Sequence, residues 1–137
     1  MIFIDSNILI DVTEDDSKWS QWSIDRIVSE SVQSQLVINQ FILAEVAPQS
    51  GSLKKFYADI GTLGIIILEL SDEAAFTAGS AFLKYRRNRG EWKTVLPDFL
   101  IGGHAQVLGA TILTRDPRFY RTYFPMVPLI TPDKAEP

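Results

Sequence analysis

The chain has 137 residues, of which 46% are hydrophobic and 22% charged, values that are typical of one globular domain. It contains no cysteine, which excludes disulfides, zinc–thiolate sites and cysteine nucleophiles. The net charge of −4 argues against a protein that wraps nucleic acid by electrostatic attraction alone, and no apolar run approaches the ~20 residues of a membrane span.

In the first half of the chain, short apolar runs alternate with helical patterns. A strand at residues 2–4 precedes the turn Ser6-Asn7, and Ile8–Ile10 begins a helix that ends at an acidic loop over residues 11–16. A second strand is expected at residues 36–38, before a short helix that Asn39 caps. Two further helices are predicted over residues 17–33 and 51–63.

The second half continues the alternation. A continuous apolar run predicts a strand at residues 65–68 with both faces covered. Helices from Ser71 to about Arg89 and from Pro97 to about Leu108 follow, and strands are predicted at residues 110–113 and 126–130, the last at a sheet edge because of its prolines. The pattern predicts an α/β fold with a mostly parallel sheet of four to five strands flanked by helices, in one domain over residues 1–130 with a frayed tail at 131–137.

Two carboxylates directly follow predicted strands. Asp5 ends the first strand and Asp116 comes after the fourth, and in open parallel sheets sites form beyond the carboxyl ends of strands. Taken alone, Asp5 is also explained as a turn or helix-cap residue, and Asp116 as part of an Asp-Pro turn.

Glu45 and Asp98 complete a set of four acids. Glu45 lies in a helix of apolar residues, so it is either the one exposed position of that helix or a carboxylate held by a cation. Asp98 lies in a first helical turn, where the helix dipole alone would favour it. Four converging carboxylates would repel one another, and a hard cation such as Mg²⁺ or Mn²⁺ relieves that repulsion. Because Mg²⁺ typically takes one or two carboxylates plus waters, not all four acids need to bind it.

Other features carry weaker signals. The single histidine, His104, lies six residues after Asp98 and off its helical face, so we expect core packing or a surface position for it and not a catalytic role. The pair Gly102-Gly103 indicates a close approach of its helix to the sheet. Residues 84–93 hold five basic residues and one acid, which either solvate a helix end or bind a phosphate backbone. Aromatic residues at 119–124 among arginines either pack in the core or stack on bases, and packing is the favoured interpretation.

The motifs resemble those of PIN domains, and most closely the VapC-type toxins of toxin–antitoxin pairs. The likeness covers nearly the whole chain in order, and it rests on these segments: Phe3–Ile10 (FIDSNILI), Glu45 in the helix after the second strand, Leu96–Ile101 (LPDFLI), Leu113–Asp116 (LTRD) and Phe119–Pro125 (FYRTYFP).

The resemblance implies a ribonuclease that depends on Mg²⁺ or Mn²⁺. Its acidic set would be Asp5, Glu45, Asp98 and Asp116, with Asp5, Asp98 and Asp116 as metal ligands. Ser6, Asn7 and Thr114 match polar supporting positions, and RNA contacts are expected from Arg115 and from Arg86, Arg87 and Arg89 of the basic strip. The family also implies a homodimer and a cognate antitoxin that masks the site. A cytoplasmic location is expected because the N-terminus does not have the pattern of a signal peptide and the cysteine-free composition fits a reducing compartment.

Two other functions remain open at the level of the sequence. A receiver-like signalling module would hold Mg²⁺ beside a phosphorylated aspartate. Such a module requires a lysine after a late strand, where this chain has Thr114-Arg115-Asp116. A metal-dependent phosphatase of the haloacid-dehalogenase type would want a second aspartate two residues after Asp5, where Asn7 stands.

Overall fold

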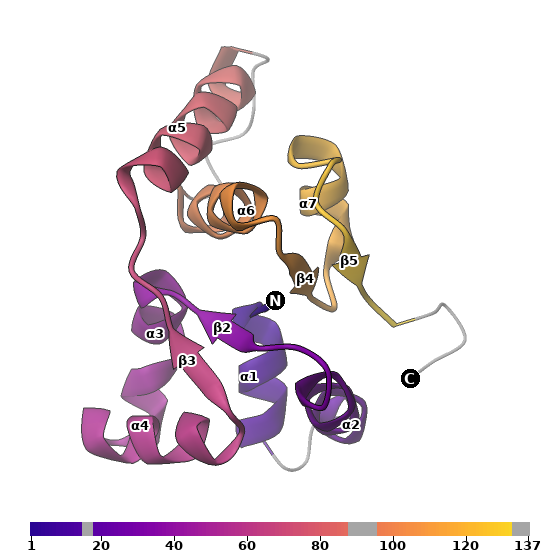
Figure 1. Ribbon diagram of the computed structural model, residues 1–137. Helices are drawn as coiled ribbons and strands as arrows, with labels where there is room; N and C mark the ends of the chain where they lie inside the picture. The colour runs from indigo at the N-terminus through magenta and orange to yellow at the C-terminus, as the bar shows by residue number, and fades with distance from the viewer. Residues whose placement is uncertain (15–17, 88–95, 133–137) are drawn as a thin grey trace.

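The computed structural model describes residues 1–14, 18–87 and 96–132, which build one five-stranded sheet with helices around it (Figure 1). All strand pairs are parallel and the order across the sheet is β3-β2-β1-β4-β5. The strands are β1 (Ile2–Ile4), β2 (Leu36–Ile38), β3 (Ile65–Ile67), β4 (Thr111–Leu113) and β5 (Leu129–Ile130). The predicted α/β class with a parallel sheet is confirmed.

The helices of the described residues follow the strands in alternation. They are α1 (Ser6–Thr13), α2 (Ser20–Ser31), α3 (Gln40–Val46), the 3₁₀ turn η1 (Ala47–Ser50), α4 (Leu53–Thr62), α5 (Asp72–Arg87), α6 (Leu96–Leu108) and α7 (Pro117–Tyr123). None of them is long and apolar enough to cross a membrane. The predicted tail is described only as far as Pro132, and Arg89 also lies outside the described residues.

One sequence-based expectation about these helices is wrong, and one helix was not predicted. Asp11 was expected in an acidic loop, but α1 continues through it to Thr13 and the Asp11 side chain is buried. The segment before the last strand, for which no helix was predicted, forms α7, with Pro117 in the first turn where a missing N–H is harmless.

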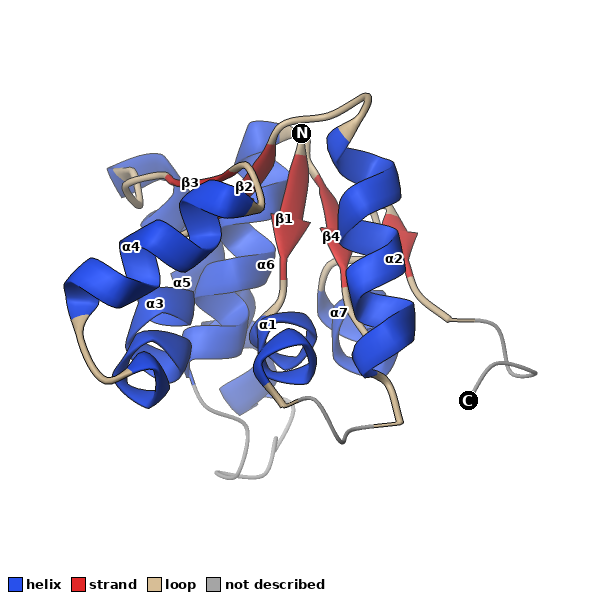
Figure 2. Cartoon of the chain, turned by 90° about the horizontal axis from the view of Figure 1, so that it is seen from below, coloured by secondary structure: helices blue, strands red, loops and turns tan. Residues whose placement is uncertain are grey.

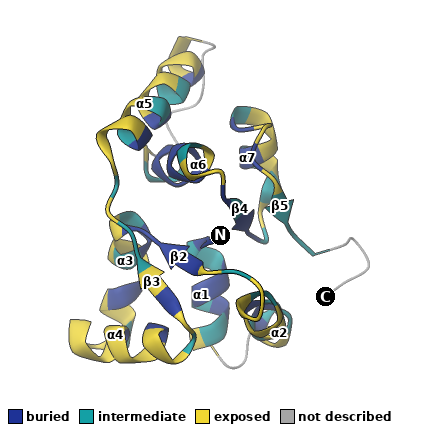
Figure 3. Cartoon of the chain, in the orientation of Figure 1, coloured by how far each residue is buried: buried dark blue, intermediate teal, exposed yellow. Residues whose placement is uncertain are grey.

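Each strand contributes only two or three residues to the sheet, and β1 and β2 are fully buried. Successive side chains point to opposite faces of the sheet. Seen from below in Figure 2, α1 and α2 lie in front of β1 and β4, with α6 behind them. Figure 3 shows the central strands buried throughout, while the outer surfaces of α2 and α4 are exposed.

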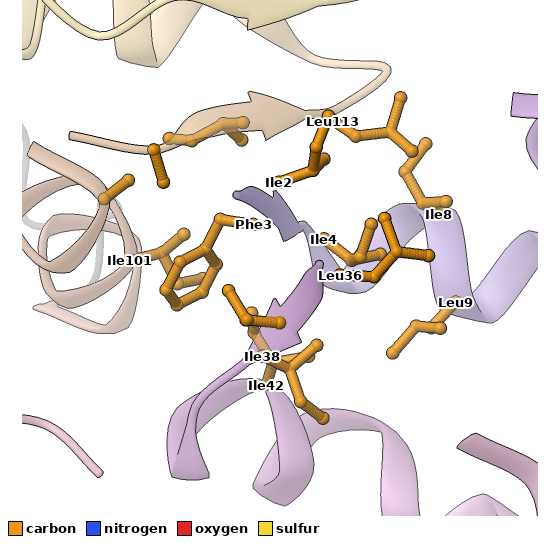
Figure 4. Close-up of a cluster of buried hydrophobic side chains, with 14 of the residues drawn as sticks. Ile2, Phe3, Ile4, Ile8, Leu9, Leu36, Ile38, Ile42, Ile101 and Leu113 are labelled. Carbon is orange, nitrogen blue, oxygen red and sulfur yellow. The ribbon is translucent and has the colours of Figure 1, made fainter. Parts of the chain in front are cut away.

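The core fills both faces of the central strand β1. Phe3 is fully buried and its ring lies beside Ile101 of α6, whereas Ile4 lies on the other side with Leu36, towards α1 (Figure 4). Burying a side chain of this size contributes roughly 1.5–3 kcal/mol, so these contacts fix β1, and the residue that follows it, firmly in place.

The edge strand β3 is less covered than the sequence indicated. Ile66 is 44% exposed, because β3 lies at the border of the sheet and its outer face has no helix over that residue. The continuous apolar run was therefore not a sign of burial on both faces. The edge position predicted for the last strand is confirmed, since β5 pairs only with β4.

Two glycines let α6 pack tightly, although not against the sheet as predicted. A Cβ on Gly103 would lie 2.7 Å from the backbone nitrogen of Ala78 in α5, and one on Gly102 would lie 2.3 Å from the ring of Phe124. The close approach is therefore between α6 and α5, with the Phe124 ring on the neighbouring side.

The strand order reverses beside β1. The chain moves from β1 to β2 and β3 on one side, then crosses to β4 and β5 on the other. A reversal of this kind opens a crevice beyond the carboxyl ends of the two strands that flank it, and ligands of open α/β sheets bind there. In this chain those strands are β1 and β4, which are directly followed by Asp5 and Thr114.

Candidate active site

Asp5 is held at the mouth of this crevice by four hydrogen bonds. Its Oδ1 accepts from the Ser6 N–H at 2.8 Å and so caps α1, while its Oδ2 accepts from the Thr114 hydroxyl at 2.8 Å. The Tyr120 hydroxyl donates to the same Oδ2 at 3.0 Å, and the Asn7 amide does so over a longer 3.4 Å. The carboxylate is thereby fixed in one orientation.

Burial and hydrogen bonding act on Asp5 in opposite directions. Desolvation raises the pKa of its carboxyl, hydrogen bonds from Thr114, Tyr120 and Ser6 lower it, and the charge of Asp116 raises it again, for a net increase. The site thus holds an anion that its surroundings leave incompletely compensated.

Tyr120 is a site residue that the sequence did not reveal. It is one of four aromatic residues in the segment 119–124, and the sequence indicated only that these rings pack in the core or stack on bases. In the structure Tyr120 is 2% exposed and points from α7 to Asp5, and burial with the nearby charge of Asp5 raises the pKa of its phenol well above the usual value. Only the pairing of α7 with the end of β1 in space creates this contact.

Thr114 and Asn7 tie the loop after β4 to α1. The Thr114 hydroxyl donates to Asp5 and accepts from the Asp116 N–H at 3.0 Å and from the Asn7 amide at 3.3 Å. Asn7 Oδ1 in turn accepts from the Arg115 N–H at 3.1 Å. These bonds use the donor and both acceptor positions of the Thr114 hydroxyl. They also fix the backbone of Asp116, the residue that precedes α7.

Glu45 reaches the site from α3. The residue is exposed, which is the alternative that its apolar surroundings left open, and its Oε2 lies 3.4 Å from the Ser6 hydroxyl. Partial desolvation and the charge of Asp5 raise the pKa of the Glu45 carboxyl, while the Ser6 hydrogen bond lowers it. Because Glu45 is exposed, its carboxylate does not need a cation to compensate for burial. The reason to expect a cation nearby is that Glu45 lies close to the negative charge of Asp5.

Asp98 completes the cluster from the first turn of α6. Desolvation, followed by the charges of Asp5, Glu45 and Asp116, raises the pKa of its carboxyl to about 6. All three other acids of the predicted set act on this one group, so the chain brings the four carboxylates from distant positions into one electrostatic cluster.

The cluster fits a divalent cation in its chemistry. It offers only carboxylate, hydroxyl and amide oxygens around its acids, which are the donors that Mg²⁺ and Mn²⁺ prefer. Among the described residues no three acidic, histidine or cysteine side chains lie close enough together to hold an ion by themselves. That spacing suits an ion bound through one or two carboxylates, with water and phosphate oxygens as its other ligands.

Comparison with known proteins identifies the family. The model of the PIN domain family matches residues 2–125. The chain belongs to the PIN domain family. A search of curated proteins found no match.

Several solved structures share the fold of this PIN domain. The chain in the VapBC2 structure from Rickettsia felis, bound to a promoter DNA fragment, is 20% identical with a TM-score of 0.76, over 97% of this chain and 100% of that one. The chain in the VapBC-1 structure from nontypeable Haemophilus influenzae is 18% identical with a TM-score of 0.71, and the match covers 96% of this chain and 98% of that one. A chain in a toxin–antitoxin complex from Klebsiella pneumoniae is 19% identical with a TM-score of 0.68, and the match covers 97% of this chain and 98% of that one.

Arg115 of this PIN domain has a structural partner that the sequence did not indicate. Its guanidinium makes a bidentate ion pair with the buried Asp11 carboxylate, and it lies over the Trp19 ring at 5.2 Å from the centroid. The Ser23 hydroxyl donates to the same carboxylate at 2.8 Å. The contact of Arg115 with RNA stays a prediction. Two of the guanidinium nitrogens already donate hydrogen bonds to Asp11 in this structure.

The remaining candidates lie apart from the acids. His104 is buried, which is one of the two positions that the sequence left open, with its Nδ1 3.2 Å from the Asn39 amide nitrogen and its ring edge-on to Phe3. Arg86 and Arg87 are exposed in the last turn of α5. Tyr85, which precedes them, contacts the Tyr123 ring of α7 at 5.5 Å, so this end of α5 lies beside α7.

Proposed function

We propose that this PIN domain is a Mg²⁺- or Mn²⁺-dependent endoribonuclease and the toxin of a toxin–antitoxin pair. The observation that carries the proposal is the convergence of four carboxylates at the crevice between β1 and β4, where three of them raise the pKa of the fourth. PIN domains are nucleases, which supports hydrolysis of a phosphodiester as the reaction.

Each acid has a separate task in the proposed reaction. Asp5 and Asp98 would hold the ion, Asp116 as the third predicted ligand would reach it through a water molecule, and the hydrogen bonds from Thr114 and Tyr120 keep the Asp5 carboxylate in one orientation. When bound, a divalent ion lowers the pKa of a water ligand and offsets the charge of the phosphate. Glu45, at the exposed rim with a raised carboxyl pKa, would serve as the general base that accepts a proton from the attacking water.

The toxin role is supported by the structures that share the fold. The structure from Klebsiella pneumoniae is a toxin–antitoxin complex, and the motifs of this sequence resemble those of VapC-type toxins, in line with the fold that it shares with VapBC2 and VapBC-1. We extend that arrangement to this chain, with a cognate antitoxin as partner, a homodimer as the assembly and the cytoplasm as the location. No observation favours a receiver-like module or a phosphatase.

An RNA cleavage assay tests the reaction. Total cellular RNA and a labelled transcript are incubated with the wild type, with Asp98→Asn and with Asp72→Asn, which makes the same change in the first turn of α5 away from the cluster. We expect Asp98→Asn to lose at least ~100-fold in rate, since even groups behind a metal ligand are worth 10–100-fold. Asp72→Asn should cleave as the wild type does, and EDTA should stop both. Cleavage that is equal in all three proteins, or that survives EDTA, would sink the proposal.

A further inference from the structure

A surface hollow runs along α7, next to the acid cluster. It has a volume of about 700 Å³, and its lining comes from the segment 116–123. Tyr120 is the one residue of that segment outside the lining, because its side chain points the other way, to Asp5. The same short helix therefore supplies a ligand-orienting group on one side and a surface groove on the other.

The groove carries two arginines on one face of the helix. Arg118 and Arg121 are three residues apart, so they are neighbours on the helix surface, and both are exposed. Within the described residues neither forms an ion pair, in contrast to Arg115, which is engaged by Asp11. Their charges are available to a ligand.

The position of the groove relates it to the site. Asp116 lines one end, so the groove begins at the carboxylate cluster. Tyr123 lines the other end and contacts Tyr85 in the last turn of α5, where Arg86 and Arg87 are exposed. A chain molecule that leaves the cluster beyond Asp116 along α7 thus passes the two arginines and the half-buried rings of Phe119 and Tyr123.

The charge of the whole protein makes such a surface necessary for an anionic polymer. The net charge is −4 and the cluster itself repels phosphate, so a single-stranded nucleic acid needs local cations beside the cut. An ion in the cluster neutralises only the phosphate that is cleaved. The phosphates next to it need partners of their own, and guanidinium groups bind phosphate oxygens with two parallel hydrogen bonds.

We propose that Arg118 and Arg121 form a phosphate-binding subsite for single-stranded RNA, in which the strand on one side of the cleaved bond lies along α7. The inference rests on the proposed ribonuclease function and adds the path of the substrate to it.

RNA binding tests this path without cleavage. In an Asp98→Asn background with Mg²⁺ present, the affinity for a labelled single-stranded RNA is measured by fluorescence anisotropy over a range of salt concentrations. Arg118→Gln with Arg121→Gln is compared with Lys54→Gln and Lys55→Gln, two exposed cations of α4 whose loss changes the net charge equally. We expect the arginine variant to bind roughly tenfold more weakly at low salt and its salt slope to fall by up to ~1.4, about 0.7 for each lost phosphate contact. The lysine variant should match its parent.

The outcomes separate this inference from the proposed function. Equal losses in the two double variants, or an unchanged salt slope for the arginine variant, would overturn the subsite. Loss of binding to a polyglutamate peptide with RNA binding intact would also overturn it, since the surface would then belong to an acidic protein partner. If the wild type cleaves no RNA while the arginine variant alone loses RNA binding, the ribonuclease proposal fails and the subsite stands.

Discussion

At the scale of single residues, the site stores electrostatic repulsion in Asp98. Its carboxyl has a pKa of about 6, raised from an ordinary value of 3.8 by burial and by three other acids. The folded state therefore binds a proton between these two values that the unfolded chain has already released. Stability from this group is complete below pH 4 and falls as the pH rises through 6, because ionised Asp98 is tolerated better in the unfolded chain.

Removing the charge of Asp98 should therefore stabilise the metal-free protein at neutral pH. We expect Asp98→Asn to raise Tm at pH 7.5 by about 2–4 °C, the effect of roughly 1 kcal/mol after solvent screening is allowed for. At pH 4 the difference should vanish. Thermal unfolding in the presence of EDTA, with Asp72→Asn as the control, measures it. A gain of the same size at both pH values would contradict the assigned repulsion.

The Tyr120 hydroxyl should matter for metal binding more than for folding. Tyr120→Phe keeps the ring but removes the donor to Asp5 Oδ2, so we expect the affinity for Mn²⁺ to fall by 10–100-fold, as for other groups that orient a metal ligand. Tyr85→Phe is the matched control, since the buried Tyr85 hydroxyl has no hydrogen-bond partner in the described part of the chain. Titration calorimetry that finds both variants equal to wild type would refute this role of Tyr120.

At the scale of elements, the contact of α5 with α6 places Asp98. The two helices touch where Gly103 lies against Ala78, a contact that leaves no room for a Cβ on residue 103, and Asp98 lies in the first turn of the same α6. A bulkier residue at this contact would push α6 away from α5 and move Asp98 with it.

A pair of glycine substitutions tests this contact. Gly103→Ala should destabilise the fold by roughly 1–3 kcal/mol, because its Cβ would meet the Ala78 backbone at 2.7 Å. Gly79→Ala, on the exposed side of α5 with nothing within 4 Å, should stabilise it by up to ~1 kcal/mol through helix propensity. Urea unfolding reads both. A neutral Gly103→Ala would show that the helices separate freely.

Some of these elements could be predicted from the sequence alone and others could not. The strands and most helices were predictable because apolar runs, Asn39 as a cap and terminal glycines are local signals. The helix α7 was not, since seven residues rich in aromatics carry no clear period. The four acids could be picked out by their place after strands and at helix starts, whereas Tyr120 and the Asp11–Arg115 pair depend on contacts between distant segments.

At the scale of the whole molecule, one ion pair joins three parts of the chain. Arg115 follows β4, Asp11 lies near the end of α1, and Ser23 of α2 donates to the same carboxylate. The pair thus holds the loop that carries Thr114 and Asp116 against the first two helices.

Breaking this pair from one side should be costly. Arg115→Met leaves Asp11, which is 2% exposed, without its cation, and we expect a loss of about 2–4 kcal/mol. Combining it with Asp11→Asn should recover part of that loss, with a coupling of at least ~1 kcal/mol. Unfolding of the four proteins of this double-mutant cycle provides the measurement. Additive effects would mean that the pair does not hold the loop.

The most direct measurement is the rate of RNA cleavage by Asp5→Asn as Mn²⁺ is titrated. The amide preserves the size of the side chain and the acceptor that caps α1, so the variant should fold, as circular dichroism can verify. We expect wild-type cleavage to rise to saturation with Mn²⁺ and Asp5→Asn to stay inactive at every concentration. Cleavage by folded Asp5→Asn at the wild-type rate would contradict a metal-dependent ribonuclease centre built on this carboxylate.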